Sequence, residues 1–320
     1  MDAALSMPDR PRLTPEQIKE LSKKSDLRSW FNIAWIFSAI FATFFIVTMW
    51  TNPLTIIAGY CFIAGLQHTI SILQHEAVHL LLFKNKKWND AAGNILLGYS
   101  IGFTMHYRII HFAHHRHLGE DEDPDMVNYE PYPSTLAFFL TVFARNITGF
   151  SAIKQSLEMV GLKAVTDEHK KKADLPPASR WHLLGLVITQ ATIFGLIAWL
   201  SVWWLYFVLW LFPLLTLAKT LTNMRNAVEH TAIVEDKNQP FARYRTILSP
   251  ALERFFLAPL NFNYHAEHHL HTIIPYYNLP KAHKLMAAQS TYDKYIHKIP
   301  GYLHFVRKYM VKKKTPADKA

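Results

Sequence analysis

The sequence reads His111-Phe112-Ala113-His114-His115 about a third of the way along the chain, which places three imidazoles at positions i, i+3 and i+4. On a helix these positions share one face, so the three rings converge. Imidazole is the commonest metal ligand among side chains, and converging lone pairs are typical of a transition-metal site. The stretch therefore predicts a helix that presents metal ligands.

Two further histidine clusters occur far away along the chain. One repeats the same spacing, as His265-Ala266-Glu267-His268-His269. The other is His75-Glu76-Ala77-Val78-His79, in which the two histidines are about one helical turn apart. Each cluster alone supplies only two or three imidazoles. We therefore expect several helices to combine the three clusters into one polynuclear metal site.

The amino-acid composition indicates a membrane protein. Half of the 320 residues are hydrophobic and only 18% are charged, compared with about 25% in a typical soluble domain. The net charge of +10 fits lysine and arginine on the cytoplasmic side of a bilayer, so no nucleic-acid partner is expected. The single cysteine, Cys61, excludes an intrachain disulfide and a thiolate metal cluster. Metal ligands must then be histidine, asparagine or carboxylate side chains.

Two long uncharged stretches predict four membrane-spanning helices. Residues 29–74 and 182–218 contain no Asp, Glu, Lys or Arg, and a helix crosses a bilayer core in about 20 residues. Each stretch therefore holds two spans joined by a short turn. Two shorter apolar runs, at 91–105 and 136–151, predict helices at the membrane surface. We place the spans at residues 30–50, 54–74, 182–200 and 202–220.

The distribution of positive charge orients these spans. The turns near residues 51–53 and 201 carry no charge, whereas Lys and Arg are concentrated at the N-terminus, in residues 84–180 and in the C-terminal third of the chain. The positive-inside rule then predicts two helical hairpins with both termini in the cytoplasm. We expect an all-α integral membrane protein in which a cytoplasmic helical cap holds the metal site. Its parts are a tail at 1–28, a membrane domain at 29–300 and a basic tail at 301–320.

The first cluster, taken alone, also matches the zinc-protease motif His-Glu-x-x-His, in which two histidines bind zinc and the glutamate acts as general base. A zinc site needs only three protein ligands, which leaves both other clusters without a role. The Asp-Gly pair that intramembrane proteases of this kind use in a later span is absent from the sequence. An intramembrane zinc protease is a remote alternative, and a non-enzymatic membrane metal carrier is another.

The three clusters, in this order and separated by paired spans, resemble the histidine boxes of the membrane fatty acid desaturase/hydroxylase superfamily. The resemblance covers roughly residues 30–290. Tyr107-Arg108 precedes the second box and Asp123-Pro124-Asp125 follows it, as in many bacterial members. Residues 263–270 and 275–280 are similar to the third box of that family and the segment after it.

The resemblance implies two irons on the cytoplasmic side. A ligand outside the boxes is implied by Asn226-Ala227-Val228-Glu229-His230, which matches an Asn-x-x-x-His segment after the fourth span of acyl-CoA desaturases. Asn226 would act through a water molecule, and Glu229 as a direct ligand or as a hydrogen-bond partner of one. Glu76 and Glu267 are expected to accept hydrogen bonds from ligand histidines. The implied ligands are His75, His79, His111, His114, His115, His230, His265, His268 and His269.

The activity that the resemblance implies is O2-dependent desaturation of a long fatty acyl chain, supplied as a lipid or an acyl thioester. Hydroxylases and ketolases that act on carotenoids, alkanes or other lipids are the alternatives, because the boxes do not distinguish these outcomes. A haem motif and a ferredoxin-like cysteine set are absent from the sequence. We therefore expect a separate electron donor of the ferredoxin, rubredoxin or cytochrome b5 type. The expected location is a bacterial inner membrane rather than the endoplasmic reticulum.

Overall fold

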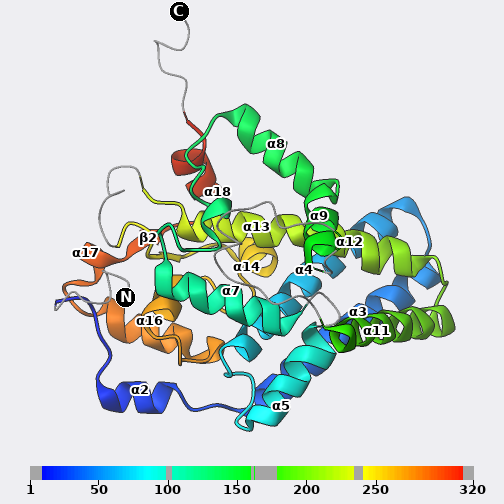
Figure 1. Ribbon diagram of the computed structural model, residues 1–320, viewed down its shortest axis with the longest axis horizontal. Helices are drawn as coiled ribbons and strands as arrows, with labels where there is room; N and C mark the ends of the chain where they lie inside the picture. Colours follow the sequence, from blue (N-terminus) through cyan, green and yellow to red (C-terminus); the bar gives the residue numbers. More distant parts are fainter. Residues whose placement is uncertain (1–8, 99–102, 160–161, 163–178, 234–240, 313–320) are drawn as a thin grey trace, which may run out of the picture.

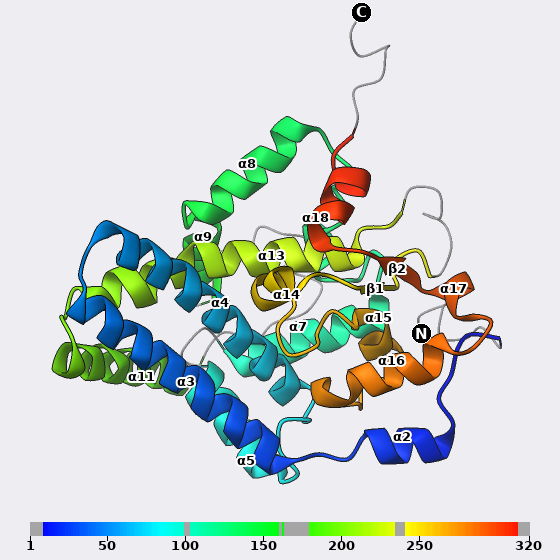
Figure 2. The ribbon, with the colours of Figure 1, turned by 180° about the vertical axis from the view of Figure 1, so that it is seen from behind.

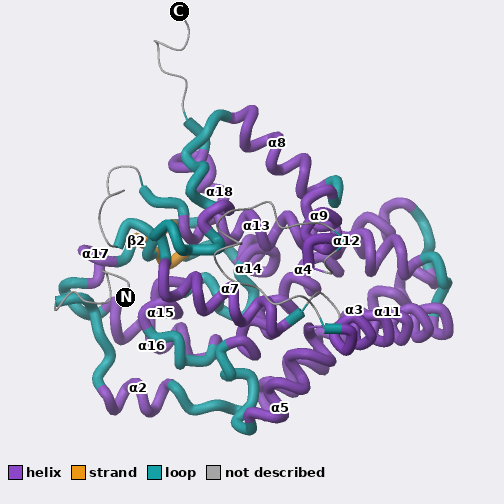
Figure 3. The backbone as a smooth tube through the Cα atoms, viewed as in Figure 1, coloured by secondary structure: helices purple, strands orange, loops and turns teal. Residues whose placement is uncertain are grey.

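The computed structural model describes residues 9–98, 103–159, 162, 179–233 and 241–312, and these are mostly helical (Figure 1, Figure 3). Four segments in this part of the chain are long and apolar enough to cross a membrane. The first three are α3 (Asp26–Met49), α4 (Pro53–Val78) and α11 (Arg180–Leu200). The fourth is Tyr206–His230, which consists of the π-helical η3 (Tyr206–Leu211), α12 (Phe212–Leu215) and α13 (Leu217–His230).

The first two spans, α3 and α4, lie side by side and are joined by a turn at residues 50–52 (Figure 2). Asn52 ends this turn, and its side chain accepts hydrogen bonds from the backbone N–H groups of Leu54 and Thr55 at 3.0 and 3.1 Å. Pro53 follows at the first helical position, where its missing N–H costs nothing. The sequence thus begins α4 sharply after a short turn, as expected for two spans within one uncharged stretch.

Two spans continue further than their apolar composition predicts. The span expected at 54–74 is a helix to Val78, and the one expected at 202–220 belongs to a segment that is helical to His230. An apolar window shows where a helix is apolar and not where its backbone ends. Both extensions carry histidines, so the polar ends of two spanning helices deliver ligand side chains directly to the site.

One short helix precedes the first span, and further short elements connect the second span to the third. The run expected as one helix at 91–105 contains η1 (Ala92–Gly98) and the first two residues of α7 (Thr104–His117), while residues 99–102 lie outside the described part. The run at 136–151 forms two helices, α8 and α9, which are bent by 66° at a break near Gly149. The elements are α2 (Pro15–Leu21), α5 (Lys86–Ala91), the π-helical η1 (Ala92–Gly98), α7 (Thr104–His117), the 3-10 turn η2 (Met126–Asn128), α8 (Leu136–Ile147) and α9 (Phe150–Met159).

The segment after α13 packs short helices around one small parallel strand pair. Thr246 in β1 is opposite Lys298 in β2. The chain does not become a tail at residue 301, because apolar side chains of α18 and η6 pack into a second buried cluster with α13 and α14. The elements are β1 (Arg245–Ile247), α14 (Ala251–Leu257), α15 (His265–Leu270), η5 (Tyr276–Asn278), α16 (Leu279–Ala287), α17 (Tyr292–Tyr295), β2 (His297–Ile299), α18 (Tyr302–Phe305) and η6 (Val306–Met310).

Candidate metal centre

Nine histidines meet where the ends of α4 and α13 approach α7 and α15 (Figure 1, Figure 2). The structure divides them into two groups. We name the first the five-histidine group and the second the four-histidine group. The five-histidine group consists of His75, His79, His111, His115 and His268. The four-histidine group joins two sets that share His230, because His114, His230 and His269 form one set and Glu229, His230 and His265 form the other.

The helical spacing within each box decides which group a histidine joins. In the second box His111 and His115, which are four residues apart, share the five-histidine group, and His114 belongs to the other. In the third box the assignment is reversed, because Nε2 of His265 lies 3.0 Å from Nε2 of His269 in the four-histidine group, whereas His268 belongs to the other group. Each His-x-x-His-His box therefore contributes one i, i+4 pair to one group and one histidine to the other.

The distances between ring nitrogens fit metal coordination. The Nε2 atom of His111 lies 2.9 Å from that of His79 and 2.9 Å from that of His115. In the other group the Nε2 atom of His265 lies 3.0 Å from those of His230 and His269. Two nitrogens bound at right angles to one metal, each about 2.1 Å from it, are about 3.0 Å apart. The residues present thus fit a metal ion in each group.

Hydrogen bonding and burial also indicate that the five-histidine group fits a metal ion. Both ring nitrogens of His75 are buried without a hydrogen-bond partner, an arrangement that is costly unless a cation binds one of them. Burial lowers the pKa of His79 to about 3, with a further contribution from the charge of Arg108. Burial also holds the pKa of His111 and His268 well below the usual value. These rings are therefore neutral, which is the form that binds a metal.

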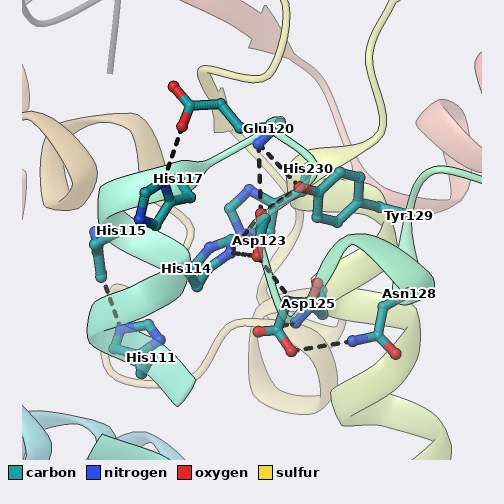
Figure 4. A network of polar contacts seen from close by, with 12 residues as sticks. His111, His114, His115, His117, Glu120, Asp123, Asp125, Asn128, Tyr129 and His230 are labelled. Carbon is teal, nitrogen blue, oxygen red and sulfur yellow. Dashed lines mark hydrogen bonds and ion pairs between the residues drawn. The ribbon is translucent and has the colours of Figure 1, made fainter. Parts of the chain in front are cut away.

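His114, in the four-histidine group, has a carboxylate partner (Figure 4). Its Nδ1 lies 3.0 Å from both oxygens of Asp123, which also accept hydrogen bonds from the hydroxyl of Tyr129 and the backbone N–H of Asp125. Burial favours neutral His114, but the Asp123 carboxylate outweighs this effect and raises the pKa of His114. Asp123 thereby fixes the proton on Nδ1 and leaves Nε2 free for a metal.

Glu229 supports the same group from a buried position. Its Oε2 lies 3.4 Å from Nδ1 of His265 and 3.5 Å from Nε of Arg225. The hydroxyl of Tyr302 donates to its other oxygen at 2.8 Å. One oxygen is engaged by Tyr302, while Oε2 is buried without a hydrogen-bond partner and lies close to ring nitrogens of His230 and His265. This position fits both roles expected of Glu229, that of a direct ligand and that of a partner that orients His265.

Asn226 lies beside this group, and one of its polar side-chain atoms has no hydrogen-bond partner. Its Nδ2 donates to Asp125 at 3.3 Å, while its Oδ1 is buried without a hydrogen-bond partner. An unpaired buried carbonyl is costly, and a bridging water is the usual remedy. The geometry therefore fits the expectation that Asn226 acts through a water molecule.

Glu76 and Glu267 differ from what the sequence predicts. One oxygen of Glu76 accepts the backbone N–H of Tyr276 at 3.2 Å, and the other is 3.9 Å from Nδ1 of His75, beyond hydrogen-bond distance. Glu267 accepts hydrogen bonds from Thr246, His283 and Tyr292, which all lie outside the two groups. Both carboxylates are fully buried and anchor neighbouring segments, because residues between ligands on a helix point away from the ligand face.

A cavity of about 860 Å³ reaches the histidines from the side of α8 and α9. Its wall includes His114, His230 and His265 of the four-histidine group, and His111 of the other. Apolar side chains of α8, α12 and α13 line much of the remainder. A molecule in this cavity would thus lie against the four-histidine group above all.

Three residues of the site escaped the sequence analysis. Tyr129 and Tyr302 hold Asp123 and Glu229 through single hydroxyl groups, and Arg225 is buried against Glu229 with its guanidinium over the ring of Phe262. No spacing rule connects the tyrosines to the boxes. Arg225 could have been identified from the sequence, because an arginine near the end of a spanning helix marks a functional position.

Comparison with known proteins identifies the family of this chain. The chain is 26% identical over 261 residues to a dihydrorhizobitoxine desaturase of Bradyrhizobium elkanii, which covers 78% of the chain and 71% of that protein. It is 26% identical over 254 residues to a beta-carotene ketolase of a Paracoccus strain, covering 77% of the chain and 86% of the ketolase. A fatty acid desaturase family model matches residues 50–300. The chain therefore belongs to the fatty acid desaturase family, whose members are known as di-iron, histidine-box enzymes.

Proposed function

We propose that this protein is an O2-dependent fatty acyl desaturase in which nine histidines bind two irons. The observation that carries the proposal is the division of the box histidines and His230 into two groups with ring nitrogens about 3 Å apart at one end of a cavity. Two irons would supply O2 activation and removal of hydrogen from an unactivated C–H bond. That chemistry suits a long acyl chain, as a lipid or an acyl thioester.

The side chains of this protein would control geometry, protonation and water. Asp123 holds the proton of His114 on Nδ1, and Glu229 lies against Nδ1 of His265, so both rings present Nε2 to a metal. The apolar cavity wall would fix one methylene of the substrate near the histidines and exclude water from it. Regiochemistry then depends on where the cavity holds the two ends of the substrate.

The orientation in the membrane follows from charge. We infer two hairpins, with both termini and a helical cap that holds the metal centre on the cytoplasmic side, because the turns at 50–52 and near 201 carry no charge. Electrons would arrive from a separate ferredoxin, rubredoxin or cytochrome b5. A basic cytoplasmic surface would suit such an acidic partner. The location we propose is a bacterial inner membrane.

A hydroxylase or ketolase is the second candidate function. The similarity to a beta-carotene ketolase favours it, since that relative matches as much of the chain as the desaturase relative does. The zinc protease fits less well, because His75 and His79 share their group with three histidines from α7 and α15. A protease would give those three histidines no role.

Gas chromatography–mass spectrometry of membrane lipids tests the proposal. The chain is expressed in a bacterial host with an electron donor system, beside a His268→Ala variant. We expect a new unsaturated fatty acid that is absent from the variant, and its double-bond position gives the regiochemistry. A new hydroxy acid would show that the protein is a hydroxylase, the second candidate function. An unchanged acyl profile, with iron-loaded protein in the membrane, would refute acyl desaturation.

A further inference from the structure

The two spanning helices that carry metal ligands end inside the protein rather than in water. Val78 is the last residue of α4 and His230 is the last residue of α13, and both are buried. The last carbonyl groups of an α-helix have no donor within the helix. A buried carbonyl without a donor is costly. Each helix end therefore needs donors from another segment, close to a ligand histidine.

Arg108, in α7, supplies donors at the end of α4. Its Nε donates to the carbonyl oxygen of Val78 at 3.0 Å, and its Nη2 donates to that of Ala77 at 2.7 Å. Nη2 also donates to Oδ1 of Asp90 at 2.9 Å, which holds the guanidinium in place. Burial lowers the pKa of His79, the next residue after Val78, and the charge of Arg108 adds to this effect. Arg108 thus holds the backbone beside a ligand of the five-histidine group.

Arg243 and Arg245, at the start of β1 and just before it, supply donors at the end of α13. Nη1 of Arg243 donates to the carbonyl oxygen of His230 at 2.9 Å. The guanidinium of Arg245 donates to the carbonyl oxygens of Val228, at 2.7 Å, and Thr231. Arg245 is fully buried, whereas Arg243 is half-buried, as Arg108 is. Arg108 and Arg243 are therefore equivalent in position, one at the end of each helix.

Arg243 also contacts the support of a second ligand in the four-histidine group. Its guanidinium carbon lies 4.9 Å from the centre of the Tyr129 ring. Tyr129 donates to Asp123, which lies 3.0 Å from Nδ1 of His114. One side chain thus connects the backbone of His230 with the residues that orient His114.

We propose that Arg108 and Arg243 are positioning residues, Arg108 for the metal of the five-histidine group and Arg243 for that of the four-histidine group. The inference rests on the proposed two-metal centre. The histidines of α4, His75 and His79, belong only to the first group, and His230 of α13 belongs only to the second. A shift of one helix end therefore displaces the ligands of one metal. A cation also complements the partial negative charge at the end of a helix.

Iron affinity of the purified full-length protein tests this inference without turnover. The protein is loaded with ferrous ion under anaerobic conditions, and a chelator withdraws the two irons in competition. Arg108→Gln and Arg243→Gln should each weaken one iron about tenfold, at the low end of the about 10–100-fold cost of losing a ligand's hydrogen-bond partner. Arg116→Gln, at an exposed position of α7, is the control and should keep both affinities. An equal loss for both irons, as expected from general destabilisation, or no loss for either, would overturn the proposal.

Combination with His268→Ala identifies which iron is weakened, because that variant is expected to keep only the iron of the four-histidine group. Arg243→Gln should weaken this remaining iron about tenfold, whereas Arg108→Gln should leave its affinity unchanged. The opposite result, in which only Arg108→Gln weakens the remaining iron, would overturn the assignment of the two arginines.

Conservative variants separate positioning from folding. Arg243→Lys should recover most of the affinity lost in Arg243→Gln, because one N–H group reaches the carbonyl of His230. Arg108→Lys should recover less, because a lysine cannot reproduce the planar fork that reaches two carbonyls and Asp90. If Arg108→Gln does not fold, Asp90→Asn tests the same point, because it removes the carboxylate that holds Nη2. Unchanged iron affinity in Asp90→Asn would then contradict the role of Arg108.

The outcome is independent of the reaction. Selective weakening of one iron by each arginine variant, without any lipid product, would contradict the proposed function alone. A lipid product from a protein whose two irons respond equally to both variants would contradict this inference alone.

Discussion

The five-histidine group and the four-histidine group are built from the same motifs but differ in their surroundings. The first gathers five imidazoles, and only His111 among them lines the cavity. The second gathers four imidazoles, three of which line the cavity, and carboxylates lie beside two of them. If each group holds a metal, five imidazoles would leave little room at the first metal, whereas the second would have room for a water or a substrate.

The largest effect is expected from removing a ligand of the five-histidine group. His268→Ala should lower product formation by more than about 100-fold, because losing a ligand exceeds the 10–100-fold cost of losing a ligand's hydrogen-bond partner. Iron per chain, measured by mass spectrometry, should fall in parallel. His304→Ala, at an exposed position, is the control and should retain both. Full iron content in the His268 variant would show that this histidine is not a ligand.

Asp123→Asn tests the support of the four-histidine group. An amide cannot hold the proton on Nδ1 of His114 as the carboxylate does, so we expect a 10–100-fold loss of affinity for one of two metals, at about the cost of such partners elsewhere. Competition with a chelator measures this loss. Asp121→Asn, exposed in the same loop, is the matched control. An equal loss of affinity for both metals would contradict the separation of the histidines into two groups.

The sequence predicts the members of the site better than their division. The i, i+3, i+4 spacing places each box on one face of a helix, and that much follows from helical geometry. Whether His114 or His115 turns toward a given group depends on where α4, α13 and α15 pack around α7. Such packing joins residues more than 100 positions apart, for example His115 and His268, whose Nε2 atoms are 3.2 Å apart. Spacing alone carries no information on these contacts.

The contacts of the carboxylates are likewise not predictable from sequence spacing. Glu229 and Glu267 each directly precede a box or ligand histidine, yet only Glu229 faces a ligand ring. Its partner Tyr302 lies in a segment that the sequence predicts to be a tail. The many lysines near the end of the chain favoured that prediction, although apolar residues of α18 pack into a buried cluster. The four spans, by contrast, were predictable, since uncharged stretches of this length are rare outside membranes.

The pH dependence of metal binding should separate the two groups further. Burial lowers the pKa of the histidines His79, His111 and His268, so they stay neutral and bind metal without releasing a proton. The raised pKa of His114 means that its metal-free ring keeps an extra proton to a higher pH than an ordinary imidazole does, and this proton must leave when a metal binds. Lowering the pH from about 8 to about 6 should weaken one metal several-fold and leave the other nearly unchanged. Calorimetry in buffers of different ionisation enthalpy counts the released proton. Equal pH dependence of the two metals would contradict the assignment.

The smallest effect concerns the hydroxyl of Tyr302. Tyr302→Phe removes a hydrogen bond to the buried Glu229, at a cost to stability of about 1–3 kcal/mol. We expect a lower thermal midpoint and a small loss of activity, while both metals remain bound. Tyr309→Phe, in the neighbouring η6, is the control. A loss of metal as large as that in Asp123→Asn would mean that Glu229 is itself a ligand.

The most direct test of the two groups is Mössbauer spectroscopy of protein purified anaerobically from cells grown on 57Fe, with the metal content measured on the same sample. The account predicts two irons per chain and two ferrous components of equal area, one from a site of five imidazoles and one from a site of four. In His268→Ala the first component should be lost preferentially. A single metal per chain, zinc in place of iron, or one uniform iron component would contradict the division on which the proposed chemistry depends.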